Sequence, residues 1–470
     1  MQSLKPRNKG PAPTLTPLPE AAGIPLSELL GALSFALDLT EGQPEGHCVR
    51  ACWIALAIAR QIDLPREGTW ELYYTVLLKD LGCSSNAARL CDLYLADDLA
   101  FKRGFKKVSG LPQILSFIVG QTGAGAPLAQ RVAQLAHVVR RGKAAARDLI
   151  ETRCHRGALI ARRMRFPEPV AAGIAALDEH WDGGGLPGGM RGTQIPLYAR
   201  IALLAQVADV FHAGAGPLAA LEAVRSRAGH WFDPSLTRAF EDAAQYPGFW
   251  DALRAPDLAQ HLFALEPAQR VTVVDERFLD DIVHGFASVI DAKSPFTAGH
   301  SERVALVSNA IAAELGIGAE HRRWIRRMAL LHDIGKLGVS NLILDKPAAL
   351  TPDERAAMER HASYTGEVLS RISAFRAFAP IAAAHHERLD GKGYPLGLRG
   401  DEIALETRIL TVADIFDALS ADRPYRAAMP MAQALDILRQ GAGTVVDPHC
   451  LAALEAVIGR SSEADFRKGT

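Results

Sequence analysis

The sequence has few of the features that define several large protein classes. Only six of its 470 residues are cysteine, at positions 48, 52, 83, 91, 154 and 450, and no two of them form a C-x-x-C pair. This argues against a disulfide framework or a thiolate zinc knuckle, and it fits a reducing cytoplasm. The longest apolar runs, such as "IALLAQVA", fall well short of the roughly 20 residues that a membrane-spanning helix needs.

Net charge is also nearly absent. The chain carries 52 basic and 53 acidic residues, so no overall field attracts nucleic acid or an acidic membrane. The arginines of "HVVRRGKAAARDLIETRCHRGALIARRMRF" alternate with apolar residues, which favours a solvated helix face over a nucleic-acid contact. The N-terminus lacks the apolar core of a signal peptide and is rich in proline and glycine, which predicts a disordered tail at 1–20. We therefore expect a cytoplasmic protein that binds neither a membrane nor a nucleic acid polymer.

What the sequence does contain is a repeat of itself. Landmarks recur in the same order: "GHCVR" and "GHSER", "LLKDLGC" and "LLHDIGK", "DEHWDGGGLPGGMRG" and "HERLDGKGYPLGLRG", "VADVF" and "VADIF", "AGHWFDP" and "AGTVVDP". The fourth landmark is preceded by three extra residues in its first occurrence. Self-similarity of this kind indicates a tandem duplication. We expect a first copy at 21–240, a connector at 241–275 and a second copy at 276–465.

Both copies are predicted to be helical. "SERVALVSNAIAAEL" and "RRWIRRMALLHDIG" place apolar residues at helical spacing. "TPDERAAMERHASYTGEVLSRI" begins with a threonine cap, a proline and acidic residues, which are typical of a helix start. The best strand candidate, "RVTVVDE" at 270–276, lies in the connector. The expected fold is all-α, with two tandem helical domains.

The second copy contains seven residues that can hold a metal ion. Any one of them has a plain structural explanation, because surface histidines and aspartates at helix ends are common. The adjacent pairs His332-Asp333 and His385-His386 differ, because burying them is costly unless a cation binds there. The full set is His300, His332, Asp333, His361, His385, His386 and Asp414.

The chemistry of this set favours two ions. Imidazole and carboxylate ligands without thiolate suit Fe, Mn or another hard-to-borderline divalent ion. Seven ligands are too many for one octahedral ion that keeps an open position, so we expect a pair about 3.5–4 Å apart, bridged by Asp333. Such a pair can activate a water and hold the oxygens of a phosphodiester.

Lys336 lies four residues after His332, a spacing that points both side chains the same way on a continuing turn. It can hold a phosphate or protonate the departing oxygen. The alternative is a helix-end lysine that faces the helix dipole.

Five segments together resemble the HD-GYP subgroup of the HD metal-dependent phosphohydrolases. They are "HSERVA", "LLHDIGKLGV", "MERHASYTGEVL", "HHERLDGKGYPLGLRGDEI" and "VADIFDALSADRPYR", and the resemblance covers about 290–455 with Gly393-Tyr394-Pro395 intact. It implies an all-α fold, a centre of two or three metal ions, and hydrolysis of cyclic di-GMP to pGpG and, in some members, GMP.

The resemblance also assigns roles to residues. It implies the same seven metal ligands, with Asp333 and Lys336 as catalytic residues and Lys336 in contact with the scissile phosphate. Arg423 and Arg426 match basic positions that hold the phosphates of the substrate. Members with a third metal tend to carry glutamate four residues before the first histidine, where this chain has Phe296. We therefore expect two ions.

The first copy matches the second but has lost reactive side chains. By sequence it keeps His47, Asp80 and Asp209, whereas Lys79 stands for His332 and Cys83 for Lys336. Leu177-Asp178 stands for the double histidine, Leu186 for the signature tyrosine, and His155 lies near the position of the third histidine. We expect a scaffold in which Lys79 neutralises carboxylates that have lost their metal. A homodimer contact or a regulatory protein partner is the further role left open for it.

The leading function is therefore a cyclic di-GMP phosphodiesterase. Two alternatives stay open: hydrolysis of another cyclic dinucleotide such as cyclic GMP-AMP, and a nucleotide-sensing regulatory scaffold in which the first copy binds a ligand that the second reports.

Overall fold

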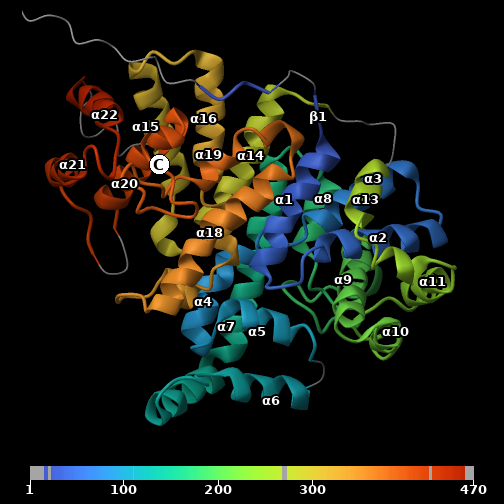
Figure 1. Ribbon diagram of the computed structural model, residues 1–470. Coiled ribbons are helices and arrows are strands. Elements are labelled where there is room, and N and C mark those ends of the chain that lie inside the picture. The colour runs from blue at the N-terminus through green and yellow to red at the C-terminus, as the bar shows by residue number, and fades with distance from the viewer. Residues whose placement is uncertain (1–14, 20–22, 109–110, 267–272, 423–425, 461–470) are drawn as a thin grey trace, which may run out of the picture.

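The computed structural model describes residues 15–19, 23–108, 111–266, 273–422 and 426–460. The predicted all-α fold is confirmed, because helices make up nearly all of its regular structure (Figure 1). The exception in the described part is a two-stranded antiparallel pair, β1 (Ile24–Pro25) and β2 (Val273–Val274), which joins the beginning of the first copy to the predicted strand of the connector.

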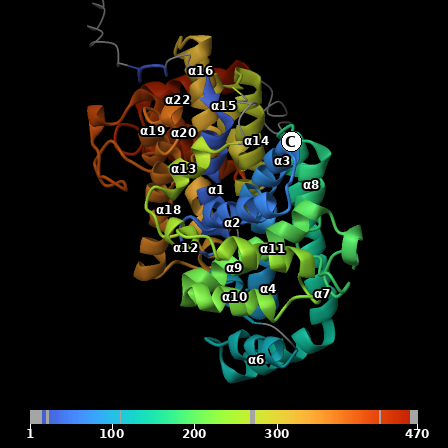
Figure 2. The same cartoon turned by 90° about the vertical axis from the view of Figure 1, so that its right-hand side faces the viewer.

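The first half of the chain forms α1 to α13 and two short 3-10 helices, η1 and η2. Their bounds are α1 (Leu26–Thr40), α2 (His47–Gln61), α3 (Arg66–Leu77), η1 (Cys83–Asn86), α4 (Ala87–Tyr94), α5 (Asp98–Phe105), α6 (Leu111–Gln121), α7 (Leu128–Arg163), α8 (Glu168–Ala175), η2 (Gly192–Gln194), α9 (Leu197–Ala215), α10 (Pro217–Arg225), α11 (Pro234–Ala244), α12 (Phe249–Ala252) and α13 (Leu258–Ala264). The α6 helix and the end of α7 that it packs on lie at one extremity of the molecule (Figures 1 and 2).

The second half forms α14 to α22 and four 3-10 helices. Their bounds are α14 (Glu276–Asp291), η3 (Pro295–Thr297), α15 (His300–Glu314), α16 (Ala319–Leu331), η4 (Ile334–Gly338), α17 (Asn341–Leu344), α18 (Pro352–Ser370), η5 (Ser373–Phe375), α19 (Ala379–Ala383), η6 (Gly400–Glu402), α20 (Leu405–Ser420), α21 (Met431–Gln440) and α22 (Pro448–Arg460).

The start of α18 shows the predicted capping chemistry. The Thr351 hydroxyl accepts a hydrogen bond from the backbone N–H of Glu354, whose carboxylate accepts one from the N–H of Thr351. Pro352 occupies the first turn, where its missing N–H costs nothing. This reciprocal cap fixes the beginning of the helix that carries His361.

One continuous hydrophobic core runs through both copies. It includes Leu29 and Leu33 of α1 together with Leu330 and Phe375 of the second half. The first helix of each copy packs on the other copy: α1 contacts η4 and α18, and α14 contacts η1 and α7. The division at 21–240, 241–275 and 276–465 stays a prediction about the repeat, and the packing shows that the two parts bury apolar surface against each other.

Part of the predicted N-terminal tail lies within the described residues. The side chains of Leu15 and Leu18 pack against the core, and the backbone N–H of Thr16 donates to Glu406 Oε1 at 2.7 Å. The stretch 15–19 therefore lies on the second copy, whereas 1–14 and 20 are outside the described residues.

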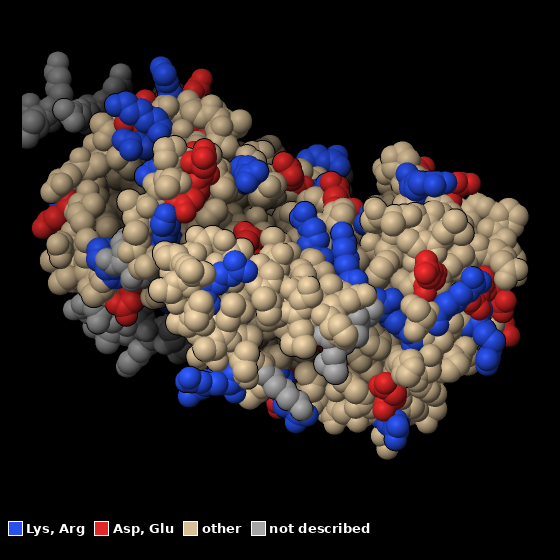
Figure 3. All heavy atoms as spheres, turned by 90° about the horizontal axis from the view of Figure 1, so that it is seen from below, with Lys and Arg blue, Asp and Glu red and all other residues tan. Residues whose placement is uncertain are grey.

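On the face shown in Figure 3, acidic and basic side chains are interspersed and most of the surface carries neither. A search of the described residues finds no helix long and apolar enough to cross a membrane.

Candidate metal centre

The seven predicted ligands come from five elements that converge in the second copy. His300 is the first residue of α15, after Gly299 in a left-handed conformation with φ of 68°. His332 and Asp333 lie where α16 ends and η4 begins, and Asp414 projects from the middle of α20. His361 belongs to α18, and His385-His386 follow α19. The structure thus brings all seven to one place.

Asp333 lies at the centre of the cluster. Its Oδ2 atom is 3.4 Å from Nε2 of His300 and 3.4 Å from Nε2 of His332. The carboxylate of Asp414 closes this side, with Oδ1 at 3.4 Å from Nε2 of His300 and 3.8 Å from Nε2 of His332. Two imidazoles and two carboxylates therefore surround one point.

The other oxygen of Asp333 faces a second group. Its Oδ1 atom is 3.6 Å from Nε2 of His361 and 3.7 Å from Nε2 of His385. These two Nε2 atoms are 3.4 Å apart, and His386 completes a set of three imidazoles whose ligand atoms lie within 4.8 Å of one another. Asp333 thus presents one oxygen to each group, which is the arrangement that a bridging carboxylate requires.

The histidines are oriented through their Nδ1 atoms. His332, His361 and His385 each bond through Nδ1 to the backbone carbonyl three residues earlier, at 2.7, 2.6 and 2.6 Å. An imidazole that donates Nδ1–H to a carbonyl leaves Nε2 as a free lone pair. All three rings therefore aim a ligand atom at Asp333.

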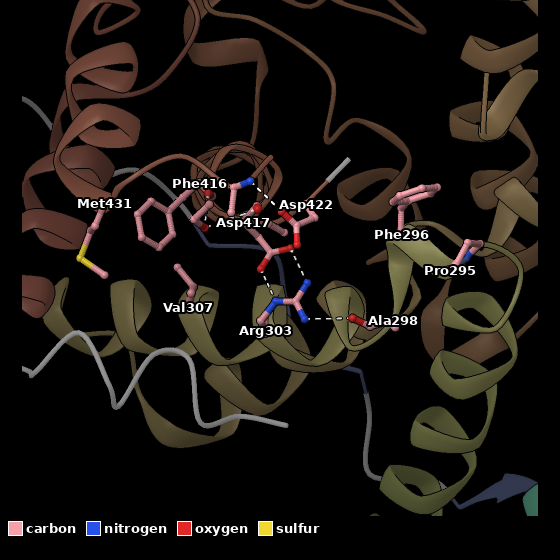
Figure 4. A pocket seen from close by; sticks show the side chains of 12 residues that line it. Pro295, Phe296, Ala298, Arg303, Val307, Phe416, Asp417, Asp422 and Met431 are labelled. Carbon is pink, nitrogen blue, oxygen red and sulfur yellow. Dashed lines mark hydrogen bonds and ion pairs between the residues drawn. The ribbon is translucent and has the colours of Figure 1, made fainter. Parts of the chain in front are cut away.

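Asp417 orients His300, and the sequence reasoning missed it. Its Oδ2 atom lies 2.6 Å from Nδ1 of His300, and Arg303 binds the same carboxylate through Nε at 2.6 Å and Nη2 at 3.1 Å. Figure 4 shows this pair in the wall of a pocket of about 370 Å³, beside Phe296, Phe416 and Met431. The available signal was spacing, because Asp417 lies one turn after Asp414 on a ligand-bearing helix.

Burial determines the protonation of the ring nitrogens. It lowers the pKa of His361 to about 3 and that of His386 to about 4, and it holds the pKa of His385 well below the usual value. Burial alone would raise the pKa of Asp333, but His332 and Lys336 hold it well below the ordinary range. The neutral imidazoles of His361, His385 and His386 can therefore bind a cation. Burial alone would lower the pKa of His300, but Asp333, Asp414 and Asp417 raise it well above the usual value.

Several buried polar atoms are placed where a cation could bind them. Nε2 of His300, Nε2 of His332 and Oδ1 of Asp333 are buried without a hydrogen-bond partner among the described residues. Orphaned buried acceptors are costly, and a metal ion would satisfy all three. The residues present therefore fit the implied divalent metals.

Lys336 lies beside the cluster with its Nζ at 2.5 Å from Oδ2 of Asp333. Its side chain is 14% exposed and lines a pocket of about 560 Å³ together with Phe296, Lys346 and Arg355. The predicted position next to the metal ligands is what the structure shows, and contact with a phosphate stays a prediction.

The two predicted arginines are placed differently. Arg423 lies outside the described residues. Arg426 donates to the carbonyls of Ala418 and Leu419 at the end of α20 and to that of Ala427, at 2.8, 3.0 and 2.8 Å. In this arrangement its guanidinium caps a helix, and its role in holding phosphate stays a prediction.

Contacts that recur in both copies correct the sequence alignment between them. Arg200 donates from Nε to the carbonyl of Ile195 and pairs with Asp233, and 208 residues later Arg408 does the same with Ile403 and Asp447. By this register α9 and α20 begin at equivalent leucines, without an insertion of three residues.

Asp209 is therefore the counterpart of Asp417 and not of Asp414. It pairs with Nδ1 of His47 at 2.7 Å and with Nε of Arg50 at 2.7 Å, as Asp417 pairs with His300 and Arg303. The position of Asp414 belongs to Gln206, which is buried in the first copy. The expectation that Asp209 keeps a metal-ligand position is wrong, because the letters "VAD" recur one helical turn out of register.

The third histidine position is occupied by Arg153. A Cβ added to Gly82 would lie 1.9 Å from the carbonyl oxygen of Arg153, and one added to Gly335 would lie 2.0 Å from that of His361. The two close approaches are equivalent, so Arg153 stands for His361. His155, which the sequence placed near this position, is exposed.

Two cations now stand among the acids of the first copy. The Lys79 ammonium pairs with Asp80, and both side chains are buried; the Arg153 guanidinium pairs with Asp178. Burial alone would raise the pKa of Asp80, but Lys79 lowers it to about 2. Glu41 and Cys83 lie near Asp80, and Glu41 is in turn bound by Lys106 at 2.8 Å. Basic side chains thus stand at two positions where the second copy has histidines, and the replacement of metal charge by Lys79 stays a prediction.

Comparisons with known proteins identify the family and several relatives. The model of the HD domain family matches residues 128–236 and 286–450. The 3′3′-cGAMP-specific phosphodiesterase 3 of Vibrio cholerae is 51% identical over 435 residues, which cover 92% of this chain and 95% of the relative. The cyclic di-GMP phosphodiesterase response regulator RpfG of Xanthomonas campestris is 39% identical over 225 residues, 46% of this chain and 58% of the relative.

A solved structure is also similar. A crystal structure described as a cyclic GMP-AMP specific phosphodiesterase from V. cholerae has a TM-score of 0.66 and 45% sequence identity, covering 94% of this chain and 99% of the other.

Proposed function

The chain belongs to the HD domain family of metal-dependent phosphohydrolases, and from that premise we propose that it is a cyclic dinucleotide phosphodiesterase whose preferred substrate is 3′3′-cGAMP. The observation that carries the reaction class is the convergence of six predicted ligands around the seventh, Asp333, with one carboxylate oxygen facing each group. The relative that supports the substrate is similar along both copies, so it shares the whole architecture and not the second copy alone.

The residues that would hold the metal follow from the geometry. His300, His332 and Asp414 would hold one ion, and His361, His385 and His386 the other, with Asp333 between them. Two divalent ions, Fe or Mn, are the proposed cofactors. When bound, such ions supply an activated water and neutralise the charge that develops on the phosphodiester.

The chain's own residues do the rest. Asp333 holds its two oxygens in place because it is buried and surrounded by four imidazoles. The Lys336 ammonium, which contacts Asp333, is positioned at the edge of the pocket to hold the scissile phosphate or to give a proton to the departing oxygen. Arg355 lines the same pocket and would attract the second phosphate, whereas Lys346, also in the lining, pairs with Glu354 at 2.6 Å.

A second substrate, cyclic di-GMP, is favoured by a different observation. Several relatives are named for it, and one of them, RpfG, is 39% identical over 225 residues, which cover 46% of this chain. The linear dinucleotide pGpG would then be the first product, and GMP a second. Both substrates have two phosphodiester bonds in a ring and differ in one base.

One experiment tests the proposal. Protein loaded with Mn²⁺ or Fe²⁺ is incubated with 3′3′-cGAMP, cyclic di-GMP and cyclic di-AMP, and the products are separated by chromatography. We expect the highest kcat/KM with 3′3′-cGAMP, lower turnover of cyclic di-GMP, and no turnover after chelation. Preference for cyclic di-GMP would support the second candidate substrate. No turnover of any of the three dinucleotides would refute the proposed function.

A further inference from the structure

A carboxylate of the first copy reaches into the second. Asp98, the first residue of α5, is fully buried, and its Oδ2 lies 3.0 Å from Nζ of Lys293, whose side chain is 1% exposed. Its Oδ1 accepts hydrogen bonds from the backbone N–H of Asn341 at 2.9 Å and from the Ser340 hydroxyl at 3.2 Å. One side chain therefore binds two separate segments of the second copy.

Both segments border the pocket beside Lys336. The first continues from Lys293 through Ser294, Phe296 and Thr297 to His300, and the second follows Lys336 through Asn341 to Leu344. Ser294, Phe296, Thr297 and Lys336 line that pocket, as do Ile343 and Leu344. Asn341 ties the segments directly, because its Nδ2 donates to the carbonyl of Lys293 at 2.7 Å.

The next turn of α5 binds two equivalent segments within the first copy. Lys102 donates from Nζ to the carbonyls of Thr40 and Cys83, each at 3.0 Å. Thr40 and Cys83 precede Lys293 and Lys336 by 253 residues each, which is also the separation of His47 and His300. One turn of α5 thus holds the equivalent loops of both copies, and only the loop of the second copy carries a reactive lysine.

The Asp98–Lys293 pair has the energetics of a positioning device. A buried pair gives little net stability, but removing one partner leaves the other charge buried and uncompensated. Both carboxylate oxygens of Asp98 are hydrogen-bonded, and a satisfied buried group of this kind holds the segments that it binds in one arrangement. Because this one fixes the walls on both sides of Lys336, its loss would move the lysine relative to Asp333.

We infer that Asp98 is a positioning residue for Lys336 and the pocket beside it, so that the first copy is needed for turnover although it has lost its metal ligands. This inference rests on the proposed function of the second copy. It assigns to the first copy a catalytic contribution through contact and not through binding of a second ligand.

The test compares two variants of the full chain, each of which truncates one buried side chain of the first copy that contacts the second. Asp98→Ala removes the clamp, whereas Ser84→Ala removes a hydrogen bond from the Ser84 hydroxyl to the carbonyl of Val289 at 2.7 Å, which touches neither wall segment. With 3′3′-cGAMP and with cyclic di-GMP, we expect Asp98→Ala to lose on the order of 10- to 100-fold in kcat/KM with metal content retained, as small misplacements of reacting groups do. Ser84→Ala is expected to keep the wild-type value.

A second readout does not depend on turnover. Amide hydrogen exchange over 336–346 in the metal-loaded chain is expected to accelerate in Asp98→Ala and to stay unchanged in Ser84→Ala. Where Asp98→Ala fails to fold, Asp98→Asn combined with Lys293→Met removes both charges and is measured in the same way.

Equal kcat/KM and equal exchange in the clamp variant and the Ser84→Ala control would overturn the inference. An inactive wild-type protein would refute the proposed function instead, and the exchange experiment would still decide whether Asp98 positions the Lys336 segment.

Discussion

The two copies share a framework and differ in the charges that it holds. In both, a histidine at a helix start pairs with an aspartate that also binds an arginine: His47, Asp209 and Arg50 in one, His300, Asp417 and Arg303 in the other. In both, a glycine allows the close approach of two chain segments at the junction. Contacts that build the junction have therefore persisted where the ligands have not.

At most of the ligand positions the two copies carry different residues. Only His47 and Asp80 correspond to ligands of the second copy, and Lys79, Arg153 and Gln206 stand for His332, His361 and Asp414. In the first copy, lysine and arginine side chains supply the positive charge beside the carboxylates. In the second copy, imidazoles and carboxylates surround Asp333, and a metal ion would supply the positive charge. The same backbone arrangement is thus compatible with lysine and arginine side chains in one copy and with bound metal ions in the other.

The largest expected effect comes from removing the central carboxylate. Asp333→Ala takes away an oxygen from each ligand group, so we expect loss of bound metal and no detectable hydrolysis, measured by elemental analysis and turnover. The equivalent change in the first copy, Asp80→Ala, is the matched control and should leave the metal content as it is. Wild-type turnover in Asp333→Ala would contradict the proposal of two metal ions held on either side of Asp333.

The next largest effect should come from Lys336→Ala. Losing one preorganised charge contact to a transition state commonly costs on the order of 10²–10³-fold in rate. We therefore expect kcat to fall by that factor while metal content stays at the wild-type level. Loss of metal in this variant would reassign Lys336 to support of Asp333.

A smaller effect is expected for the residue that orients His300. Asp417→Asn keeps the shape but weakens the hold on Nδ1, and changes of this kind typically cost about 10- to 100-fold in metal affinity. Titration with Mn²⁺ measures it, with Asp209→Asn in the first copy as the control. Unchanged affinity would show that α15 alone fixes the imidazole.

A substitution at the Lys79–Asp80 pair of the first copy is expected to lower the free energy of unfolding without changing the metal content. Lys79→Met strands the buried carboxylate of Asp80, and breaking such a pair typically costs roughly 3–5 kcal/mol. We expect chemical denaturation to show that loss, and the double variant with Asp80→Asn to recover part of it. A harmless Lys79→Met would remove the idea that lysine replaces metal charge.

The ligands could be predicted from the sequence because their signal is local. His332-Asp333 and His385-His386 are adjacent pairs that are costly to bury without a cation. His300, His361 and Asp414 were candidates by residue type, and the resemblance to the HD-GYP subgroup implies the same three ligands. The roles of Asp209 and Arg153 could not be predicted, because a helix shifted by three residues presents nearly the same face and the letters "VAD" fit both registers. Asp98 was also out of reach, because its partners lie 195 and more residues away.

The packing also changes one expectation about separate function. Because all seven predicted ligands lie in the second copy, the sequence alone predicts that a fragment from near Val271 binds metal and hydrolyses substrate. The shared core and the Asp98–Lys293 pair now predict that such a fragment loses part of its apolar support and its clamp on the Lys336 segment. Its kcat/KM, compared with the full chain, measures how much the first copy contributes.

The central claim is that metal belongs to the second copy and side-chain cations to the first. Anomalous diffraction from crystals of the full chain loaded with Mn²⁺ or Fe²⁺ tests this directly, because it locates each ion. We expect two peaks flanking Asp333, one toward His300 and Asp414 and one toward His361 and His386, and no peak beside Asp80. A peak beside Asp80, or none at Asp333, would contradict the account.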